Sequence, residues 1–308
     1  MNTSRLLATL MLTSDPQIGL YRAAVRQAQV KRGQLEQTGA VDPAFEDLPD
    51  IDGYERELLL IDELIAAANA LRPDAVIVCG DMLQDWDSDE QTRLMLEAAA
   101  GLDDGIPIHW VAGNHDIAPD TYRPTAEALA RYRDSFGADR YVADVGSVRL
   151  IVMNSTAVHS DALPAERAAN LEFLEAELAA ATTADQQPIV CSHHPWFLRD
   201  VDAVPPDPVT AMEIPPGPRR QLLEIAEAGG LRTLLTGHLH QHLTRTAGDL
   251  LQITTSAIGL PFARNPSGYQ LVRVYADHVE HEAHDLPSGP RLHDEARRIW
   301  AARQHPVA

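Results

Sequence analysis

The sequence has few cysteines, little positive charge and no long hydrophobic run. Two cysteines, Cys79 and Cys191, occur among 308 residues. Each lies inside an apolar, strand-like run, so we expect buried, reduced thiols. Lys and Arg number 25 against 45 Asp and Glu, a formal net charge of −20. Because a chain this acidic repels nucleic acids and anionic membrane surfaces unless positive charge is concentrated locally, and no Lys/Arg run does so, we expect neither partner.

No apolar stretch approaches the roughly 20 residues that a membrane span needs. The apolar run near the N-terminus, LLATLMLT, leads straight into an Asp-Pro-Gln loop, which favours a first core strand. A weak signal peptide is the alternative, although the single early Arg and the lack of a clear small-residue cleavage site argue against it. Together these features predict a cytoplasmic protein.

Strand-like runs alternate with amphipathic helical stretches along the chain. The runs are short and rich in Val, Ile and Leu, as buried strands are. The predicted strands are 6–13, 75–79, 106–111, 148–154, 188–192, 233–236, 250–255 and 269–275. The predicted helices are 55–70, 89–102, 125–136, 165–181 and 219–229. This alternation predicts βαβ units in a layered α/β fold.

We predict one domain over residues 1–308. Residues 21–53 show no clear strand and are interpreted as an insertion between the first strand and its helix. Residues 200–218 are rich in proline and predict a long loop, of a kind that is often functional or mobile. Residues 290–304 predict a C-terminal helix. The His-containing stretch 277–285 is interpreted as a solvated terminal edge strand rather than a metal-binding tract.

Polar side chains follow five of the predicted strands, at the point where each strand ends. The segments are SDPQ (14–17), GD (80–81), GNHD (113–116), SHHP (192–195) and GHLH (237–240). In three of them Gly comes first, where it allows a sharp turn and a close approach. Because ligands of α/β sheets bind outside the carboxyl ends of strands, we expect these five segments to converge on one site.

The residue types in these segments suit two divalent cations. A carboxylate can bridge two metals, amide oxygens suit hard cations, and imidazoles suit Zn, Fe and Mn. Two cations roughly 3.5–4 Å apart can hold both the attacking hydroxide and a phosphoryl oxygen of an in-line displacement.

D-x-[H/Q], GD, GNHD, H-x-P and GHxH, in this order, resemble the motifs of the calcineurin-like metallophosphoesterase superfamily. The resemblance runs from Asp15 to about Gly259. It implies a four-layer α-β-β-α sandwich of two mixed β-sheets flanked by helices, with a dimetal site at one edge. SDPQIGL, GNHDI and SAIGLPFARNPSG are most similar to the calcineurin-like phosphoesterase domain-containing group, which includes a cytosolic Ser/Thr phosphatase.

The resemblance also implies roles for individual residues. One metal would be held by Asp15, Gln17, Asp81 and His240. The other would be held by Asp81, Asn114, His193 and His238, so that Asp81 bridges the two. His115 would be the catalytic His that contacts the phosphate and helps to protonate the leaving oxygen, with Asp116 orienting it. The nucleophile would be a metal-bound hydroxide.

Gln17 departs from the commoner motif, because an amide replaces the usual imidazole. A neutral but harder ligand favours Mn²⁺ or Mg²⁺ over Zn²⁺ at that site; the other effect it could have is weaker metal binding there. Of the candidate ions Mn, Fe, Mg and Zn, we therefore favour Mn. The alternative is that the Gln17 amide bonds only water or backbone.

A second departure concerns the phosphate-binding cation. Phosphoprotein phosphatases of the superfamily carry GDxxDRG, whereas this chain reads GDMLQDWDSDE, without Arg. Arg264 is our candidate for contacting phosphate, as a bidentate donor. His194, next to His193, is expected to line the substrate side of the site. Trp196 and Phe197 either line the pocket or belong to the core.

These observations predict an enzyme that hydrolyses a phosphate ester, a phosphatase acting on monoesters in the first place. A phosphodiesterase acting on cyclic nucleotides or small diesters is the alternative. A third hypothesis is a metal-binding scaffold with an impaired site, which would predict loss of ligands or of the catalytic His. His115 and most of the motif residues are present.

Overall fold

The computed structural model describes residues 4–37, 45, 48–207, 209–262 and 265–304. They form two mixed β-sheets. One sheet has the strand order β11 (Val279–Asp285), β10 (Gly268–Tyr275), β1 (Leu6–Thr13), β2 (Ala75–Val78) and β3 (Ile108–Trp110). The other has the order β4 (Tyr141–Val145), β5 (Val148–Val152), β6 (Gln187–Cys191), β7 (Thr233–Thr236), β9 (Leu250–Thr254) and β8 (Leu243–Ala247).

The strands that lead into the polar segments are parallel within their own sheet. β1, β2 and β3 run parallel in one sheet, and β5, β6, β7 and β9 run parallel in the other. Antiparallel strands complete both sheets: β10 and β11 beside β1, β4 beside β5, and β8 beside β9. The carboxyl ends of the parallel strands of each sheet therefore meet at one edge, as the polar segments require.

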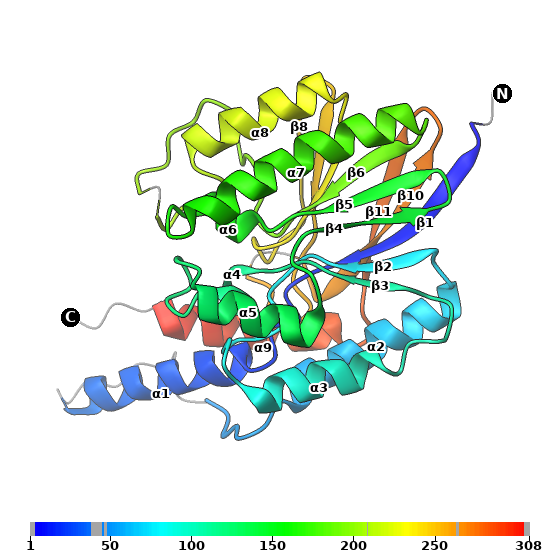
Figure 1. Ribbon diagram of the computed structural model, residues 1–308. Helices are drawn as coiled ribbons and strands as arrows, with labels where there is room; N and C mark the ends of the chain where they lie inside the picture. Colours follow the sequence, from blue (N-terminus) through cyan, green and yellow to red (C-terminus); the bar gives the residue numbers. More distant parts are fainter. Residues whose placement is uncertain (1–3, 38–44, 46–47, 208, 263–264, 305–308) are drawn as a thin grey trace.

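Helices cover the outer faces of both sheets (Figure 1). α7 (Pro164–Thr183) and α8 (Pro216–Ala228) lie over one sheet, and α2 (Glu55–Leu71), α3 (Asp89–Ala99) and α5 (Ala126–Phe136) lie over the other. Two short helices, α4 (Asn114–Ile117) and α6 (Ser155–His159), follow β3 and β5. α1 (Leu20–Gln37) packs against α9 (Gly289–Gln304). The predicted α-β-β-α sandwich is confirmed.

The apolar side chains of the strands alternate between two cores. On β1, Leu10 and Leu12 face the core between the sheets, whereas Met11 packs under the helices. On β6, Ile189 faces the inter-sheet core and Val190 packs against the outer helices. Successive residues of a strand point to opposite faces, so a strand buried on both faces needs an unbroken apolar run. The predicted central strands are confirmed for this reason.

The structure differs from the sequence prediction mainly at the periphery. Residues 21–53, interpreted as an insertion with no clear strand, begin with most of the 18-residue helix α1, which was not predicted. Strands β4 and β8 were not predicted, because they are only partly buried and carry short, half-polar sequences. The solvated edge strand expected over the His-containing stretch is confirmed as β11. Within the described residues, none of the helices combines the length and the apolar character that a membrane crossing requires.

Glu57 of α2 joins that helix to the start of α1. It is 1% exposed, and its carboxylate accepts hydrogen bonds from the backbone N–H groups of Gly19 (3.2 Å) and Tyr21 (3.0 Å). Burial raises the pKa of Glu57 to about 7, although these hydrogen bonds and Arg56 oppose the shift. A carboxyl with a raised native pKa binds more protons in the native state than in the unfolded state. Its contribution to stability therefore falls as pH rises from the ordinary range of Glu to about 7.

Glu57→Gln is expected to remove this pH dependence while keeping an acceptor oxygen. The free energy of unfolding of the wild type, relative to the variant, should fall by about 2–3 kcal/mol between pH 4.5 and 7.5. Urea unfolding of metal-free protein across this range measures it. Glu55→Gln, at an exposed position of the same helix, is the matched charge control. Parallel stability curves for wild type and Glu57→Gln would contradict the assignment.

Candidate metal centre

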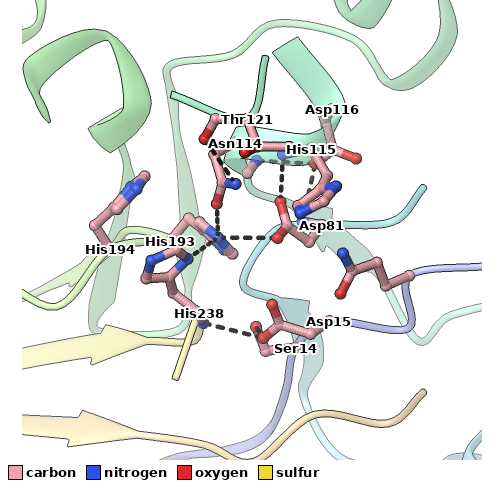
Figure 2. A network of polar contacts seen from close by, with 12 residues as sticks. Ser14, Asp15, Asp81, Asn114, His115, Asp116, Thr121, His193, His194 and His238 are labelled. Carbon is pink, nitrogen blue, oxygen red and sulfur yellow. Dashed lines mark hydrogen bonds and ion pairs between the residues drawn. The ribbon is translucent and has the colours of Figure 1, made fainter. Parts of the chain in front are cut away.

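The candidate ligands lie at the edge where the two sheets present their carboxyl ends (Figure 2). They come from five different loops, and all seven are within the described residues. The loops follow β1 (Asp15, Gln17), β2 (Asp81), β3 (Asn114), β6 (His193) and β7 (His238, His240). Six of these side chains are at most 5% exposed, and His238 is half-buried. The convergence expected from the strand ends is therefore observed.

Four of these side chains surround one point. His193 Nε2 lies 2.9 Å from Asn114 Oδ1, 3.0 Å from His238 Nδ1 and 3.3 Å from Asp81 Oδ2 (Figure 2). His193 Nδ1 lies 2.7 Å from the Cys79 carbonyl oxygen, which can only accept. Nδ1 therefore carries a proton, and Nε2 presents a lone pair when the ring is neutral, as it would be beside a cation. Oxygen and nitrogen lone pairs that converge in this way fit a cation.

A second group of ligand atoms lies next to the first. His240 Nε2 is 3.3 Å from Asp15 Oδ1, and His240 Nδ1 is 2.6 Å from the Leu260 carbonyl oxygen, which leaves Nε2 with the lone pair. Asp15 Oδ1 and Gln17 Oε1 are buried and have no hydrogen-bond partner. Leaving buried polar oxygens unpaired costs free energy. A cation beside them would remove that cost, so this donor set also fits a divalent metal.

The backbone at the site is strained. Eight non-glycine residues among those described have positive φ, and five of them are candidate ligands: Asp15 (50°), Gln17 (40°), Asp81 (54°), His238 (69°) and His240 (52°). The left-handed region costs such residues on the order of 1–3 kcal/mol each and persists only where the surroundings impose it. Concentration of that strain on one set of polar residues supports a functional role for the set.

Glycine is required next to two of the ligands. A Cβ atom on Gly113 would lie 2.1 Å from Asp81 Oδ1, and one on Gly80 would lie 2.3 Å from His193 Nδ1. Both contacts are shorter than any tolerated Cβ contact. The glycines that precede the polar residues therefore allow neighbouring loops to touch, as the sequence predicted.

The pKa values of His193 and Asp81 are set by the charged groups around them. Burial alone would lower the pKa of His193, but the carboxylates of Asp81 and Asp15 outweigh it and raise this pKa to about 9. Burial would raise the pKa of Asp81, but the imidazoles of His193 and His115 hold it below its usual value. The carboxylates of Asp81 and Asp15 thus attract positive charge to this point of the site.

His115 is positioned by backbone groups. Its ring Nδ1 lies 3.1 Å from the Gln84 carbonyl oxygen, and its backbone N–H donates to Asp81 Oδ1 at 2.8 Å (Figure 2). The carbonyl fixes the proton on Nδ1, so Nε2 is the nitrogen available for chemistry. The side chain is half-buried, as is that of His238, whereas the other six candidate ligands are at most 5% exposed.

The role expected for Asp116 is wrong. Its carboxylate does not contact the His115 ring but accepts from the backbone N–H groups of Gly113 (2.8 Å), Asp81 (2.9 Å) and Leu83 (3.2 Å). Burial, reinforced by the Asp81 carboxylate, raises the pKa of Asp116 to about 7. Asp116 thus ties the loop after β3 to the loop after β2 and leaves the orientation of His115 to Gln84.

His194 lies in a group of rings beside the site. It stacks on His159 with centroids 4.7 Å apart, and its ring lies 4.4 Å from that of His238. Ser155 Oγ accepts from the backbone N–H groups of His193 (3.1 Å) and His194 (2.9 Å). Burial, then the neighbouring imidazoles, lowers the pKa of His194, which keeps it neutral. Sequence reasoning gave no role to His159 and Ser155, because their relation to the site is tertiary.

Of the remaining substrate-side candidates, the structure describes Trp196 and Phe197. Trp196 and Phe197 are fully buried in the core under α7 and α8, which resolves the alternative in favour of the core. Arg264 lies outside the described residues. Within the chain segments that the structure describes, no arginine hydrogen-bonds or ion-pairs with any of the seven candidate ligands.

Comparisons with known proteins agree with this geometry. The family model for calcineurin-like phosphoesterases matches residues 9–242. The human serine/threonine-protein phosphatase CPPED1 is 28% identical over 285 residues, covering 90% of this chain and 83% of that protein. A 3′,5′-cyclic adenosine monophosphate phosphodiesterase, CpdA, from Pseudomonas aeruginosa is 26% identical over 66% of this chain and 67% of its own. Among solved structures, a dimetal phosphatase from Danio rerio superposes with a TM-score of 0.56 at 13% identity, covering 91% of this chain and 96% of that one.

Proposed function

Because the chain belongs to the calcineurin-like phosphoesterase family, we propose that it is a phosphatase that uses two divalent cations to hydrolyse a phosphate monoester. Membership of the family makes it a hydrolase of phosphate esters. Preference for a monoester is supported by similarity to human CPPED1 over 90% of the chain, against 66% for the bacterial cyclic nucleotide phosphodiesterase. The diesterase remains the second candidate, and both would use the same site.

The ligand assignment rests on the two groups of lone-pair atoms. Asp15, Gln17, Asp81 and His240 would hold one cation, and Asp81, Asn114, His193 and His238 would hold the other. The observation that carries the proposal is the pair of unpartnered buried oxygens, Asp15 Oδ1 and Gln17 Oε1, beside the convergent Asp81, His193 and His238. Two cations, when bound, would lower the pKa of an attacking water and neutralise phosphoryl charge.

The residues of the chain then perform the positioning and the proton transfer. Hydrogen bonds from His193 Nδ1 and His240 Nδ1 to backbone carbonyls aim both Nε2 atoms into the site. His115, in its imidazolium form, would donate the Nε2 proton to the leaving oxygen while Nδ1–H stays on the Gln84 carbonyl. Arg264, which lies outside the described residues, stays our candidate for a contact to the phosphate.

The choice of metal follows from Gln17. An amide oxygen in place of an imidazole makes one site all-oxygen except for His240, and hard oxygen ligands favour Mn²⁺ or Mg²⁺ over Zn²⁺. We propose Mn²⁺ as the preferred ion.

Reconstitution of metal-stripped protein tests the function. We expect no hydrolysis of p-nitrophenyl phosphate after chelation, and recovery with two Mn²⁺ per chain ahead of Mg²⁺, Fe²⁺ or Zn²⁺. Bis-p-nitrophenyl phosphate run in parallel decides between monoesterase and diesterase. A His278→Ala/His284→Ala variant, altered just before the edge strand β11 and on it, controls for adventitious metal. Protein that binds metal but turns over neither ester would support the scaffold hypothesis instead.

A further inference from the structure

Gln17 poses an orientation problem that an imidazole at the same position would not pose. An amide presents an oxygen on one end and an NH₂ group of similar size on the other, and a cation is attracted by one and repelled by the other. Gln17 is 2% exposed, so water does not hold its amide in place. Something in the protein must select the orientation with the oxygen free.

We propose that Gln84 is the positioning residue that holds the Gln17 amide with its oxygen available to a cation. Gln17 Nε2 donates to Gln84 Oε1 at 3.2 Å, whereas Gln17 Oε1 has no partner. An accepting group on the NH₂ side thus selects the orientation that frees the oxygen. The inference rests on the proposed function, because it takes Gln17 to be a metal ligand.

Asn114, the other amide of the site, is arranged in the same way. Its Nδ2 donates to the Thr121 carbonyl oxygen at 3.1 Å, and its Oδ1 faces His193 Nε2 at 2.9 Å (Figure 2). Both amides therefore give their NH₂ group to an acceptor and leave the oxygen for the centre. Asn114 is held by backbone, whereas Gln17 is held by a side chain that a substitution can remove.

Backbone hydrogen bonds fix the relative position of the two glutamines without help from their side chains. Gln17 N–H donates to the Asp81 carbonyl at 2.9 Å, Ile18 N–H to Met82 at 3.1 Å, and Gln84 N–H to Ile18 at 3.1 Å. The contact of the Gln84 carbonyl with His115 also belongs to the backbone. Replacing the Gln84 side chain is thus expected to leave the loop and His115 in place. It should remove only the hydrogen bond from Gln17 Nε2 to Gln84 Oε1, which we call the amide clamp.

Titration of metal-free protein with Mn²⁺, followed by calorimetry, measures the effect directly. Gln84→Met keeps the length of the side chain but loses the amide. It is expected to lower the binding affinity for one of the two Mn²⁺ ions by about 10- to 100-fold, the usual size of such indirect effects on a metal ligand. The other ion should bind as in wild type. Low-temperature Mn²⁺ electron paramagnetic resonance should show loss of the spin-coupled pair at limiting metal. The melting temperature of the metal-free protein should stay unchanged.

Two further variants separate clamping from a general structural role. Gln84→Glu keeps an acceptor for the Gln17 NH₂ group, because a carboxylate accepts hydrogen bonds, so this variant should bind both Mn²⁺ ions. Gln17→His needs no amide orientation, so Gln17→His/Gln84→Met should bind Mn²⁺ like Gln17→His alone. Wild-type affinity in Gln84→Met, or equal weakening by that substitution in the Gln17→His background, would overturn the inference.

The test also distinguishes failure of this inference from failure of the proposed function. If Gln17→Ala lowers the affinity for one Mn²⁺ ion and Gln84→Met does not, the inference about the amide clamp is wrong and the ligand assignment stands. If Gln17→Ala leaves both affinities unchanged, Gln17 is not a ligand and the clamp falls with it. If the wild type binds no Mn²⁺, the dimetal function itself is wrong.

Discussion

Replacing Asp81 with asparagine is expected to abolish phosphatase activity and to reduce bound Mn²⁺ below two ions per chain. Asp81 is the residue assigned to both cations, and its two oxygens already have separate tasks. Oδ1 accepts from His115 N–H at 2.8 Å, and Oδ2 lies 3.3 Å from His193 Nε2. An asparagine has one acceptor oxygen and no charge, so it can satisfy one of these tasks but cannot bridge two cations.

The expected loss is large because two cations at the site would supply most of the transition-state stabilisation. Metal stabilisation of the transition state is worth several kcal/mol, and each 1.4 kcal/mol is about tenfold in rate, so kcat/KM should fall by on the order of 10³-fold. Metal content measured beside turnover shows whether binding is the cause. Asp87→Asn, at an exposed position in the same loop, is the matched control. Asp81→Asn protein that keeps two tightly bound Mn²⁺ ions and near-normal turnover would exclude the bridging role.

Replacing His115 with alanine is expected to lower kcat by about 10²–10⁴-fold, the usual contribution of a general acid, with two Mn²⁺ ions still bound. His115 is half-buried, and its Nδ1 is held by the Gln84 carbonyl. It is not assigned to either metal, so metal stoichiometry should not change. This separation of turnover from binding distinguishes it from Asp81.

The leaving group gives a second readout for His115. An alkoxide needs a proton more than p-nitrophenolate does, so the loss should be greater for an alkyl phosphate than for p-nitrophenyl phosphate. His278→Ala, at an exposed position just before the edge strand β11, should leave both rates unchanged. An equal loss with both substrates would mean that His115 contacts the phosphate without protonating the leaving oxygen.

Most of the fold and the identity of the site residues could be predicted because both depend on local patterns. A central strand buried on two faces must be apolar throughout, so β1, β2, β6 and β7 stand out as short runs of Val, Ile and Leu. Each such run ends where a polar residue appears, and Gly113 and Gly80 mark the turns because a Cβ atom there would collide with a neighbouring loop. Edge elements such as β4 and β8 lack this double burial and therefore lack the pattern.

The partners of the site residues could not be predicted in the same way. Asp116 sits beside His115 in the chain, which suggested an Asp–His pair, yet its carboxylate is closed off by three backbone N–H groups from other parts of two loops. His159 and Ser155 come from α6 and reach His194 only because β5 and β6 are neighbours in the sheet. Adjacency in the sequence does not determine which way a side chain points from a strained loop.

By itself, the sequence determined the layered α/β fold, the edge at which the site lies, the family, and the seven side chains that meet there. The fold and the edge follow from the apolar periodicity and from polar residues at strand ends, whereas the family and the seven side chains follow from the resemblance of five short motifs to the calcineurin-like metallophosphoesterases; all of these are properties of short segments. Only the tertiary structure decided the positive φ of five of the ligands, the tautomers set by carbonyls on His193 and His240, and the acceptor that leaves the Gln17 oxygen free. Each of these depends on two loops from different strands meeting at a few ångströms, and no single segment encodes that distance.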